Sequence, residues 1–155
     1  MPHPPEIDVA DPTDFLAIAA LDRIAWIHTG EQFIPDGEHV WRVWCEHATV
    51  LICRGTPPSE STGDVLAALV MFPTQDGSLF LHKIMVHPAS RGEGIGTALM
   101  RNALAQAKSS VLLTVDPAND AAGRLYVNFG FREHEHIKGY YRPHEDRLVM
   151  VCEAK

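Results

Sequence analysis

The sequence is short of basic residues and has no long hydrophobic run. Its 155 residues include 13 Lys and Arg against 20 Asp and Glu, for a formal net charge of -7. This balance argues against partners held mainly by phosphate groups, such as nucleic acids or anionic membranes. The longest apolar run, Val65 to Phe72, is far shorter than the roughly 20 residues that a membrane-spanning helix needs. The opening MPHPPEID has neither the basic nor the apolar segment of a secretory signal, so we expect a cytoplasmic protein.

Cysteine is also scarce. The three cysteines form no CxxC motif, and any disulfide scheme leaves one of them unpaired. We therefore expect reduced thiols that serve as small hydrophobic side chains, namely Cys45, Cys53 and Cys152. His134 and His136 alternate with charged residues and could hold a metal only together with His144. That alternation is typical of a solvated strand, so we expect no metal.

What is present is the composition of one globular domain over residues 1–155, with 46% hydrophobic and 21% charged residues. The spacing of apolar and turn-forming residues predicts a strand at 7–10, then a helix that begins behind the capping cluster at 11–14 and ends near Thr29-Gly30. A second helix starts at Asp36-Gly37. Strands follow at 48–55, 65–72 and 78–86, the last two joined by a turn at 74–77. The second helix runs through Val40, Trp41, Val43 and Trp44, and its two aromatics, at i and i+3, are expected to form a core-facing stripe.

The second half continues with a helix that starts in a glycine-rich turn and carries apolar residues from Ile95 to Ala107. A strand at 111–116 precedes a short helix that Asn119 or Asp120 can cap and that Gly130 can end with a positive φ. The last two strands are predicted at 131–141 and 147–153. There are no internal repeats, so we predict a single α/β domain with a mixed sheet.

The segment from Leu81 to Met100 is the most informative for function. It reads as a strand, a short loop, three glycines and a helix, which places the backbone N–H groups of residues 92–97 at a helix N-terminus. Such a turn can cradle an anion, and glycine lets phosphate oxygens approach the amides. A P-loop would need a Lys-Ser or Lys-Thr after the glycines, and a Rossmann turn normally follows the first strand. Neither pattern fits.

The segment instead resembles the acyl-CoA diphosphate loop of the GCN5-related N-acetyltransferase (GNAT) superfamily, whose pattern [RQ]xxGx[GA] is met by Arg91, Gly94 and Gly96. Further along, Asn119, Tyr126 and Phe129-Gly130-Phe131 are similar to the family's next motif, and Gly139-Tyr140-Tyr141 to its aromatic pair. The resemblance by motif covers the second half of the chain. It implies the acyl-CoA N-acyltransferase fold, with a mostly antiparallel central sheet of six to seven strands flanked by about four helices.

The resemblance also implies a reaction in which a neutral amine attacks the thioester of acetyl-CoA and expels CoA thiolate. Tyr126 is the candidate acid for the thiolate, with simple packing as the alternative. The expected CoA-binding residues are Ile84, Met85, Val86, Arg91, Gly92, Glu93, Gly94, Ile95, Gly96, Thr97 and Asn119. In this assignment Arg91 and the amides of residues 92–97 hold the diphosphate, while Asn119 and the backbone of residues 84–86 bind the pantetheine arm.

The general base departs from the pattern of some relatives. Relatives that acetylate protein N-termini often carry Glu where this chain has Thr114, and Thr cannot accept a proton from an ammonium. His82 is similar in position to an acid of other members, and an imidazole with an unperturbed pKa of about 6.5 suits the role, directly or through water. Water acting alone is the remaining option. The loop from His28 to Gly37, with Glu31 and Asp36, would attract a cationic acceptor.

These features favour acetyl transfer to a primary amine of a small molecule or peptide, without a metal. Two alternatives stay open. One is a protein N-terminal or lysine acetyltransferase, suggested by Tyr140-Tyr141 and opposed by Thr114. The other is a non-catalytic acyl-CoA-binding sensor that keeps the cradle but has no working base. The acceptor is not identified by the sequence, and a homodimer is possible because family members are often dimers.

Overall fold

A computed structural model describes residues 4–26, 34–55 and 63–154. In these ranges a seven-stranded sheet has the order β1-β2-β3-β4-β5-β7-β6. The strands are β1 (Ile7–Val9), β2 (Thr49–Arg54), β3 (Val65–Pro73), β4 (Leu79–Val86), β5 (Val111–Val115), β6 (Arg132–Ile137) and β7 (Arg147–Cys152). The α-helices are α1 (Phe15–Ile24), α2 (Glu38–His47), α3 (Ile95–Gln106) and α4 (Asp120–Asn128). The predicted α/β fold with a mixed, mostly antiparallel sheet is confirmed, because β4 and β5 pair in parallel while the neighbouring ladders are antiparallel. Among the described residues, no helix has the length and hydrophobicity that crossing a membrane requires.

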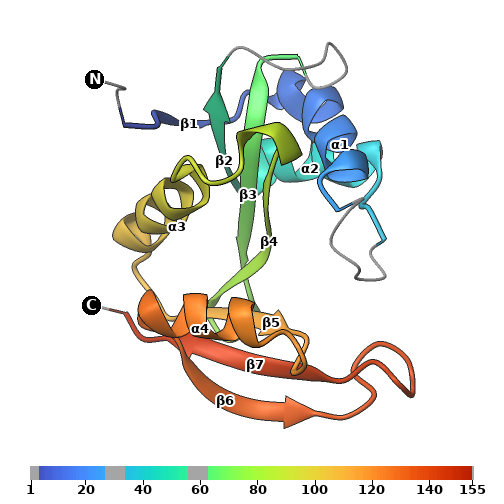
Figure 1. Cartoon of the computed structure of the whole chain (residues 1–155), viewed down its shortest axis with the longest axis vertical. Helices are drawn as coiled ribbons and strands as arrows, with labels where there is room; N and C mark the ends of the chain where they lie inside the picture. Colours follow the sequence, from blue (N-terminus) through green and yellow to red (C-terminus); the bar gives the residue numbers. More distant parts are fainter. Residues whose placement is uncertain (1–3, 27–33, 56–62, 155) are drawn as a thin grey trace. The chain divides into compact units, whose positions relative to one another are not determined.

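The chain divides into two compact units, one built from residues 1–71 and 83–103 and the other from residues 72–82 and 104–155. In the first unit, α1 and α2 lie on one side of the strands and α3 lies on the other (Figure 1). Antiparallel pairs join β1 to β2 and β2 to β3, for example Val9 with Leu51 and Leu51 with Leu69. The core of this unit contains the fully buried side chains of Ile18, Leu21, Trp41, Val50, Leu51, Ile52, Val65, Leu69, Leu99 and Met100.

The start of α1 follows the predicted capping cluster. The Asp11 carboxylate accepts from the Thr13 amide at 2.9 Å, and the Asp14 carboxylate accepts from the Asp11 amide at 2.8 Å, a reciprocal capping box. The predicted end of this helix was wrong. The helix ends at Ile24, where the Arg91 guanidinium donates to the Ala25 carbonyl and so satisfies a group that a longer helix would use. Thr29 and Gly30 lie outside the described residues.

Helix α2 begins after Gly37, as predicted, and its two aromatics contact each other. Trp41 is fully buried, and its ring meets that of the half-buried Trp44 edge-on at 5.0 Å between centroids. Val43 is 54% exposed. On a helix, residues two positions apart point in different directions, and the buried face is set by Trp41 and Cys45, which are one turn apart.

The turn between β3 and β4 has the predicted position. Gly77 has a φ of +88°, and the Asp76 carboxylate accepts from the Thr74 hydroxyl at 2.5 Å and from the Ser78 amide at 3.1 Å. These bonds hold the pKa of Asp76 below its ordinary value, the Thr74 hydroxyl first. The turn therefore fixes the register of two strands that each pass from one unit into the other.

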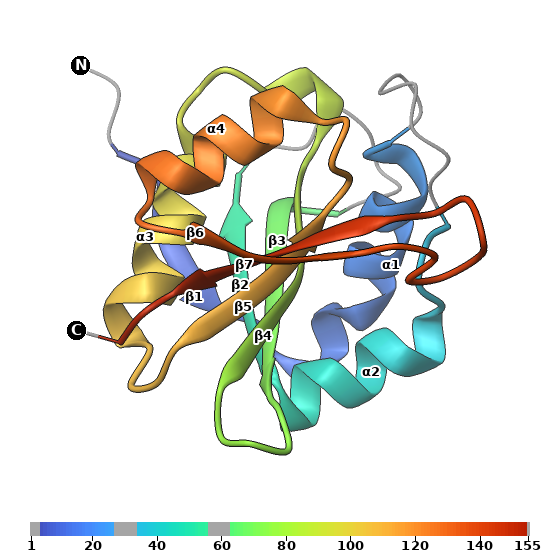
Figure 2. The same ribbon diagram turned by 90° about the horizontal axis from the view of Figure 1, so that it is seen from below.

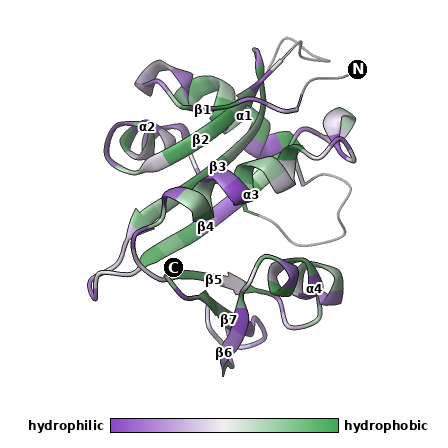
Figure 3. Ribbon diagram, turned by 90° about the vertical axis from the view of Figure 1, so that its left-hand side faces the viewer, coloured by the Kyte–Doolittle hydropathy of each residue, from purple (hydrophilic) through white to green (hydrophobic). Residues whose placement is uncertain are grey.

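In the second unit β5, β7 and β6 form antiparallel pairs, and β6 and β7 make a hairpin with a long connection (Figure 2). β6 is shorter than the predicted strand at 131–141. Its residues 132–136 are all exposed, and Figure 3 shows it as hydrophilic. Gly139, with a φ of +62°, and the bond from its amide to the Asp146 carboxylate bend the chain away before residue 141.

Candidate active site

The predicted site residues fall in both units. The first unit holds the glycine-rich turn, Arg91 and residues 84–86, whereas His82, Asn119 and Tyr126 belong to the second.

The glycine-rich turn leads directly into α3. Gly92 and Gly94 both have a φ of +81°, a left-handed conformation that L side chains rarely adopt. The Ala98 amide donates to the Gly94 carbonyl at 3.0 Å, which makes it the first amide bonded within the helix. The amides of Ile95, Gly96 and Thr97 precede it and have no partner in the helix.

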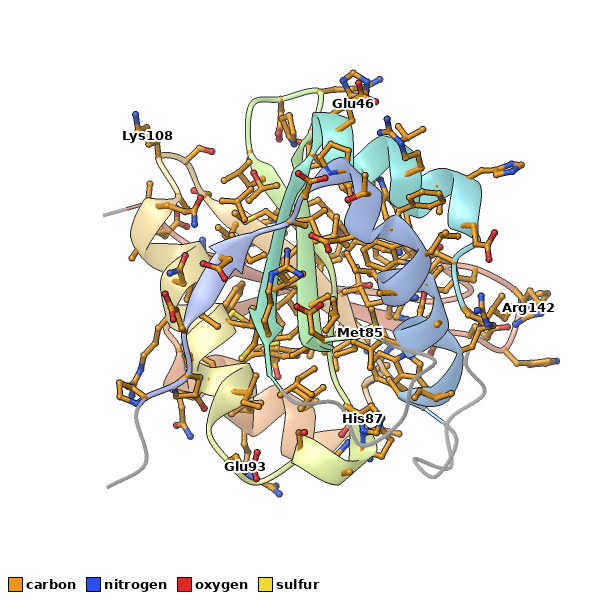
Figure 4. The ribbon with its side chains drawn as sticks, turned by 90° about the horizontal axis from the view of Figure 1, so that it is seen from above. Glu46, Met85, His87, Glu93, Lys108 and Arg142 are labelled. Carbon is orange, nitrogen blue, oxygen red and sulfur yellow. The ribbon has the colours of Figure 1, made fainter. Side chains whose placement is uncertain are left out.

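Open space surrounds this turn. A Cβ atom added to Gly92 or Gly94 would meet no other atom within 4 Å. Glu93, between them, is exposed and lies at the outer edge of the molecule, whereas Met85 lies inside it (Figure 4). Exposed backbone amides at the positive end of a helix are the donors that a diphosphate accepts from, so these residues fit that group of CoA.

Arg91 is turned toward α1. Its guanidinium bonds to the Ala25 carbonyl at the end of that helix, where the partial negative charge of the helix dipole favours a cation. This hydrogen bond joins α1 to the start of the glycine-rich turn.

Residues 84–86 form the last part of β4. Met85 is buried at 3% exposure, while Ile84 and Val86 on the opposite face are half-buried. A Cβ atom added to Gly96 would lie 3.6 Å from Val86 Cγ2, so α3 starts close to the end of this strand. Their side chains belong to the packing, and any ligand role would fall to their backbone groups.

Sequence reasoning missed a buried ion-paired cluster in the first unit. Lys83 Nζ lies 2.9 and 3.0 Å from the two oxygens of Asp22 and 2.7 Å from Oδ2 of Asp36. Trp41 and the Asp36 amide also donate to Asp22, at 3.0 and 2.9 Å, as does Trp26 at 3.2 Å. The signal was a lysine within the apolar strand and an aspartate on the apolar face of α1. Asp36 is thus already paired with a cation, and Glu31 lies outside the described residues, so attraction of a cationic acceptor by this loop stays a prediction.

His87, directly after β4, was also missed. It is 7% exposed, and its amide donates to the Leu66 carbonyl of β3 at 2.7 Å. Nδ1 accepts from the Ala89 amide at 3.1 Å and so caps the short 3-10 helix Pro88–Ser90, whereas the buried Nε2 has no hydrogen-bond partner among the described residues. Burial, and secondarily the charge of Arg91, lower the pKa of His87.

In the second unit Asn119 caps α4, as predicted, because its Oδ1 accepts from the Ala122 amide at 3.1 Å. Tyr126 lies on the same helix and packs against Phe131, with ring centroids 5.9 Å apart. Gly130 has the predicted positive φ, at +105°, and a Cβ there would lie 3.6 Å from Cys152 Sγ. The packing role of Tyr126 is therefore observed, and its role as an acid stays a prediction.

His82 lies on β4 in a row of half-buried rings. Its ring centroid is 6.2 Å from that of Phe72 and 6.5 Å from that of Phe80, and the two phenylalanines stack at 5.7 Å. Thr114 of β5 pairs with Val149 of β7. Among the described residues, then, an imidazole on β4 and a hydroxyl on β5 occupy the two positions considered for the base.

The remaining candidates do not form a site. The described residues contain no group of three His, Cys, Asp or Glu side chains that could hold a metal ion, and His136 Nε2 instead lies 3.2 Å from Asp146 Oδ2. None of the three cysteines forms a disulfide within the described part of the chain, and Cys45 and Cys53 are buried as predicted. Burial raises the pKa of Cys45 to about 11 and also raises that of Cys53, which argues against an acyl-carrier thiol at either position.

Comparison with known proteins gives consistent matches. Residues 18–131 match the model of the acetyltransferase (GNAT) family. The chain is 27% identical over 149 residues to the L-2,4-diaminobutyric acid acetyltransferase of Streptomyces anulatus, covering 79% of this chain and 80% of that protein. In three of the curated relatives that it matches, including this one, the aligned part spans 29%, 80% and 40% of the relative's own length.

Two solved structures show the same fold. The ribosomal-protein-S18-alanine N-acetyltransferase of Escherichia coli aligns with a TM-score of 0.78 and 22% identity, over 97% of this chain and 94% of that one. The structure of yncA from Salmonella typhimurium with its cofactor acetyl-CoA aligns with a TM-score of 0.74 and 20% identity, over 99% and 95%. At these identities the likeness establishes the fold.

Proposed function

Because the chain belongs to the acetyltransferase (GNAT) family, we propose that it transfers the acetyl group of acetyl-CoA to a primary amine of a small molecule or peptide. The observation that carries the proposal is the turn at Gly92 and Gly94, with its open surroundings and with the first amides of α3, which have no partner within the helix. The name of the Streptomyces relative, a diaminobutyrate acetyltransferase, and the acetyl-CoA held by yncA support the donor and the class of acceptor.

The proposed CoA-binding roles are assigned to residues of each unit separately. The amides from Gly92 to Thr97 would hold the diphosphate, with Arg91 exchanging its bond to the Ala25 carbonyl for a phosphate oxygen. Backbone groups of Ile84, Met85 and Val86 would bind the pantetheine arm. Asn119 would add a side-chain bond while it caps α4.

The proton transfers fall to the chain's own side chains. Acetyl-CoA supplies an activated thioester; the C–N bond forms as the C–S bond breaks. The His82 imidazole would take the proton of the substrate ammonium, directly or through water, and the Tyr126 hydroxyl would give its proton to the departing sulfur. The rings of Phe72 and Phe80 beside His82 limit its contact with water, which suits a group that has to exchange protons with one substrate.

We extend the proposal to the organisation of the protein. The family match at residues 18–131 includes parts of both units, which supports one catalytic domain over residues 1–155. Three cysteines without a disulfide among the described residues are consistent with a reducing, cytoplasmic location. A homodimer is included in the proposal, and sedimentation equilibrium of the purified chain would test it.

Calorimetry with CoA and a thiol-release assay with acetyl-CoA test the function. We expect CoA to bind, and a panel of 2,4-diaminobutyrate, other small amines and short peptides to include at least one acceptor. Failure to bind CoA would refute the proposal. Binding without turnover would favour the non-catalytic sensor, and turnover confined to peptides would favour the N-terminal or lysine acetyltransferase.

A further inference from the structure

We infer that His87 is a positioning residue for the CoA-binding turn, and that its neutral ring must cap the chain ahead of the turn for CoA to bind. The inference rests on the proposed function and adds a residue and a pH dependence to it. It starts from an unusual cap. Ser, Thr, Asp and Asn are the common caps of helix N-termini, whereas here an imidazole nitrogen accepts the hydrogen bond of the capped amide.

The hydrogen bonds fix the protonation state of the ring. Nδ1 accepts from the Ala89 amide at 3.1 Å, so Nδ1 carries no proton and Nε2–H is the donor of a neutral imidazole. Pro88 has no N–H, which makes the Ala89 amide the first donor of the short helix that needs an acceptor. A second proton on the ring would go to Nδ1 and would face that amide with another donor.

The cap lies at the entrance to the glycine-rich turn. The Ser90 amide donates to the His87 carbonyl at 2.9 Å, and the next residues are Arg91 and Gly92. The chain between the end of β4 and the turn is therefore held by the His87 amide, its carbonyl and its ring. Loss of the hydrogen bond between the Ala89 amide and the ring would leave residues 88–91 less firmly held, and these residues set the orientation of the amides that follow.

The surroundings of His87 oppose its protonation. The turn carries two charged residues, Arg91 and the exposed Glu93 at the outer edge of the molecule. Burial of the ring, and secondarily the field of Arg91, lower the pKa of His87. Lys83 lies on the same buried face of β4, where Asp22 of α1 and Asp36 pair with it. β3 contributes the uncharged Leu66. Within residues 4–26, 34–55 and 63–154, no carboxylate is paired with the imidazole, and the buried Nε2–H has no acceptor whose bond a positive charge would strengthen.

The sign of the pH effect follows. The pKa of His87 is lower in the folded chain than the ordinary value of 6.5, so the neutral cap stabilises the fold fully above pH 6.5. That contribution is lost as the pH falls from 6.5 through the folded pKa. CoA affinity should fall as the pH approaches and passes below the folded pKa of His87, because the folded chain then carries the charged ring.

The test compares CoA binding by the wild type and His87→Asn between pH 8 and pH 5. Asn also caps helices but does not titrate. We expect equal Kd values within about twofold at pH 8. Below the pKa of His87 the ratio of wild-type to variant Kd should rise, approaching about tenfold per pH unit for one coupled proton. Taking the ratio of the two Kd values removes the effect of the titration of CoA's own phosphate. In the control His39→Asn, at an exposed histidine of α2, the Kd should follow the pH in the same way as in the wild type.

Two further measurements complete the test. His87→Ala, which has no acceptor, should weaken CoA binding about two- to thirtyfold at pH 8. NMR of the wild type should show an Nε2–H tautomer, and its Ala89 amide should shift with the His87 titration; this readout does not require the variant to fold. A flat Kd ratio through the NMR midpoint, or a proton on Nδ1 at pH 8, would overturn the inference. Absence of CoA binding at every pH, with the Ala89 shift present, would instead refute the proposed function.

Discussion

Removing Lys83 should destabilise the protein more than any comparable loss of a surface lysine. Its side chain is 6% exposed, and that of Asp22 is fully buried. Lys83→Met keeps most of the apolar stem but removes the three contacts of Nζ with Asp22 and Asp36, at 2.9, 3.0 and 2.7 Å. The cluster then changes from two carboxylates and one ammonium, a net charge of -1, to a net charge of -2.

The expected cost comes from the carboxylate that stays behind. Breaking a buried ion pair by removal of one partner costs about 3–5 kcal/mol of unfolding free energy, because a buried charge loses its compensation. Asp22 keeps hydrogen bonds from Trp41, Trp26 and the Asp36 amide, which points to the lower half of that range. For a chain of this length, 3 kcal/mol corresponds to a fall in Tm of about 6–12 °C.

Urea and thermal unfolding, followed by circular dichroism, would measure the loss. Lys108→Met is the matched control, because Lys108 is exposed; its effect should stay within about 0.5 kcal/mol. In Asp22→Asn/Lys83→Met the loss should be smaller than the sum of the single losses by about 0.5–3 kcal/mol. Equal effects of Lys83→Met and Lys108→Met, or strict additivity in the double variant, would refute the reasoning.

Three predictions concern the proposed site. Gly94→Ala should weaken CoA binding about tenfold, since alanine in a left-handed conformation costs about 1–2 kcal/mol. Gly37→Ala, at a φ of -82°, should leave the Kd for CoA unchanged. An unchanged Kd in Gly94→Ala would contradict the binding of CoA by this turn. Tyr126→Phe should lower kcat about 100-fold or more with little change in CoA affinity, and equal losses in both would leave only the packing role. His82→Ala should remove the rising limb of the pH–rate profile, because only a neutral imidazole takes a proton; an unchanged limb would assign that step to water or to the substrate.

Features set by neighbours in the chain were predictable. The capping box at Asp11 and Asp14, the turn at 74–77 and the cap at Asn119 depend on side chains within three residues of the amides they bind. The same holds for the glycine-rich turn, where the sequence places glycines and the structure shows two of them at positive φ. For these local features, the sequence was sufficient to predict the backbone structure.

Features set by distant residues were not predictable. Lys83 and Asp22 are separated by 61 positions, and the apolar pattern of each element says only that a charged residue interrupts it. The end of α1 depends on Arg91, which is 66 positions from the carbonyl it binds. The role of His87 becomes visible only once Nδ1 is placed beside the Ala89 amide, because an imidazole is a rare cap.

The outermost strand of the sheet has a consequence for association. β6 ends the strand order, so its far backbone edge is open to pairing with another chain. Three features discourage such growth: alternating Arg, Glu and His side chains, their complete exposure, and an irregular register between Glu133 and Glu135. A second molecule that added a strand there would bring carboxylates against carboxylates in an interrupted ladder. Any stable dimer should therefore form through another surface, and concentrated solutions should resist fibrous aggregation through this side of the molecule.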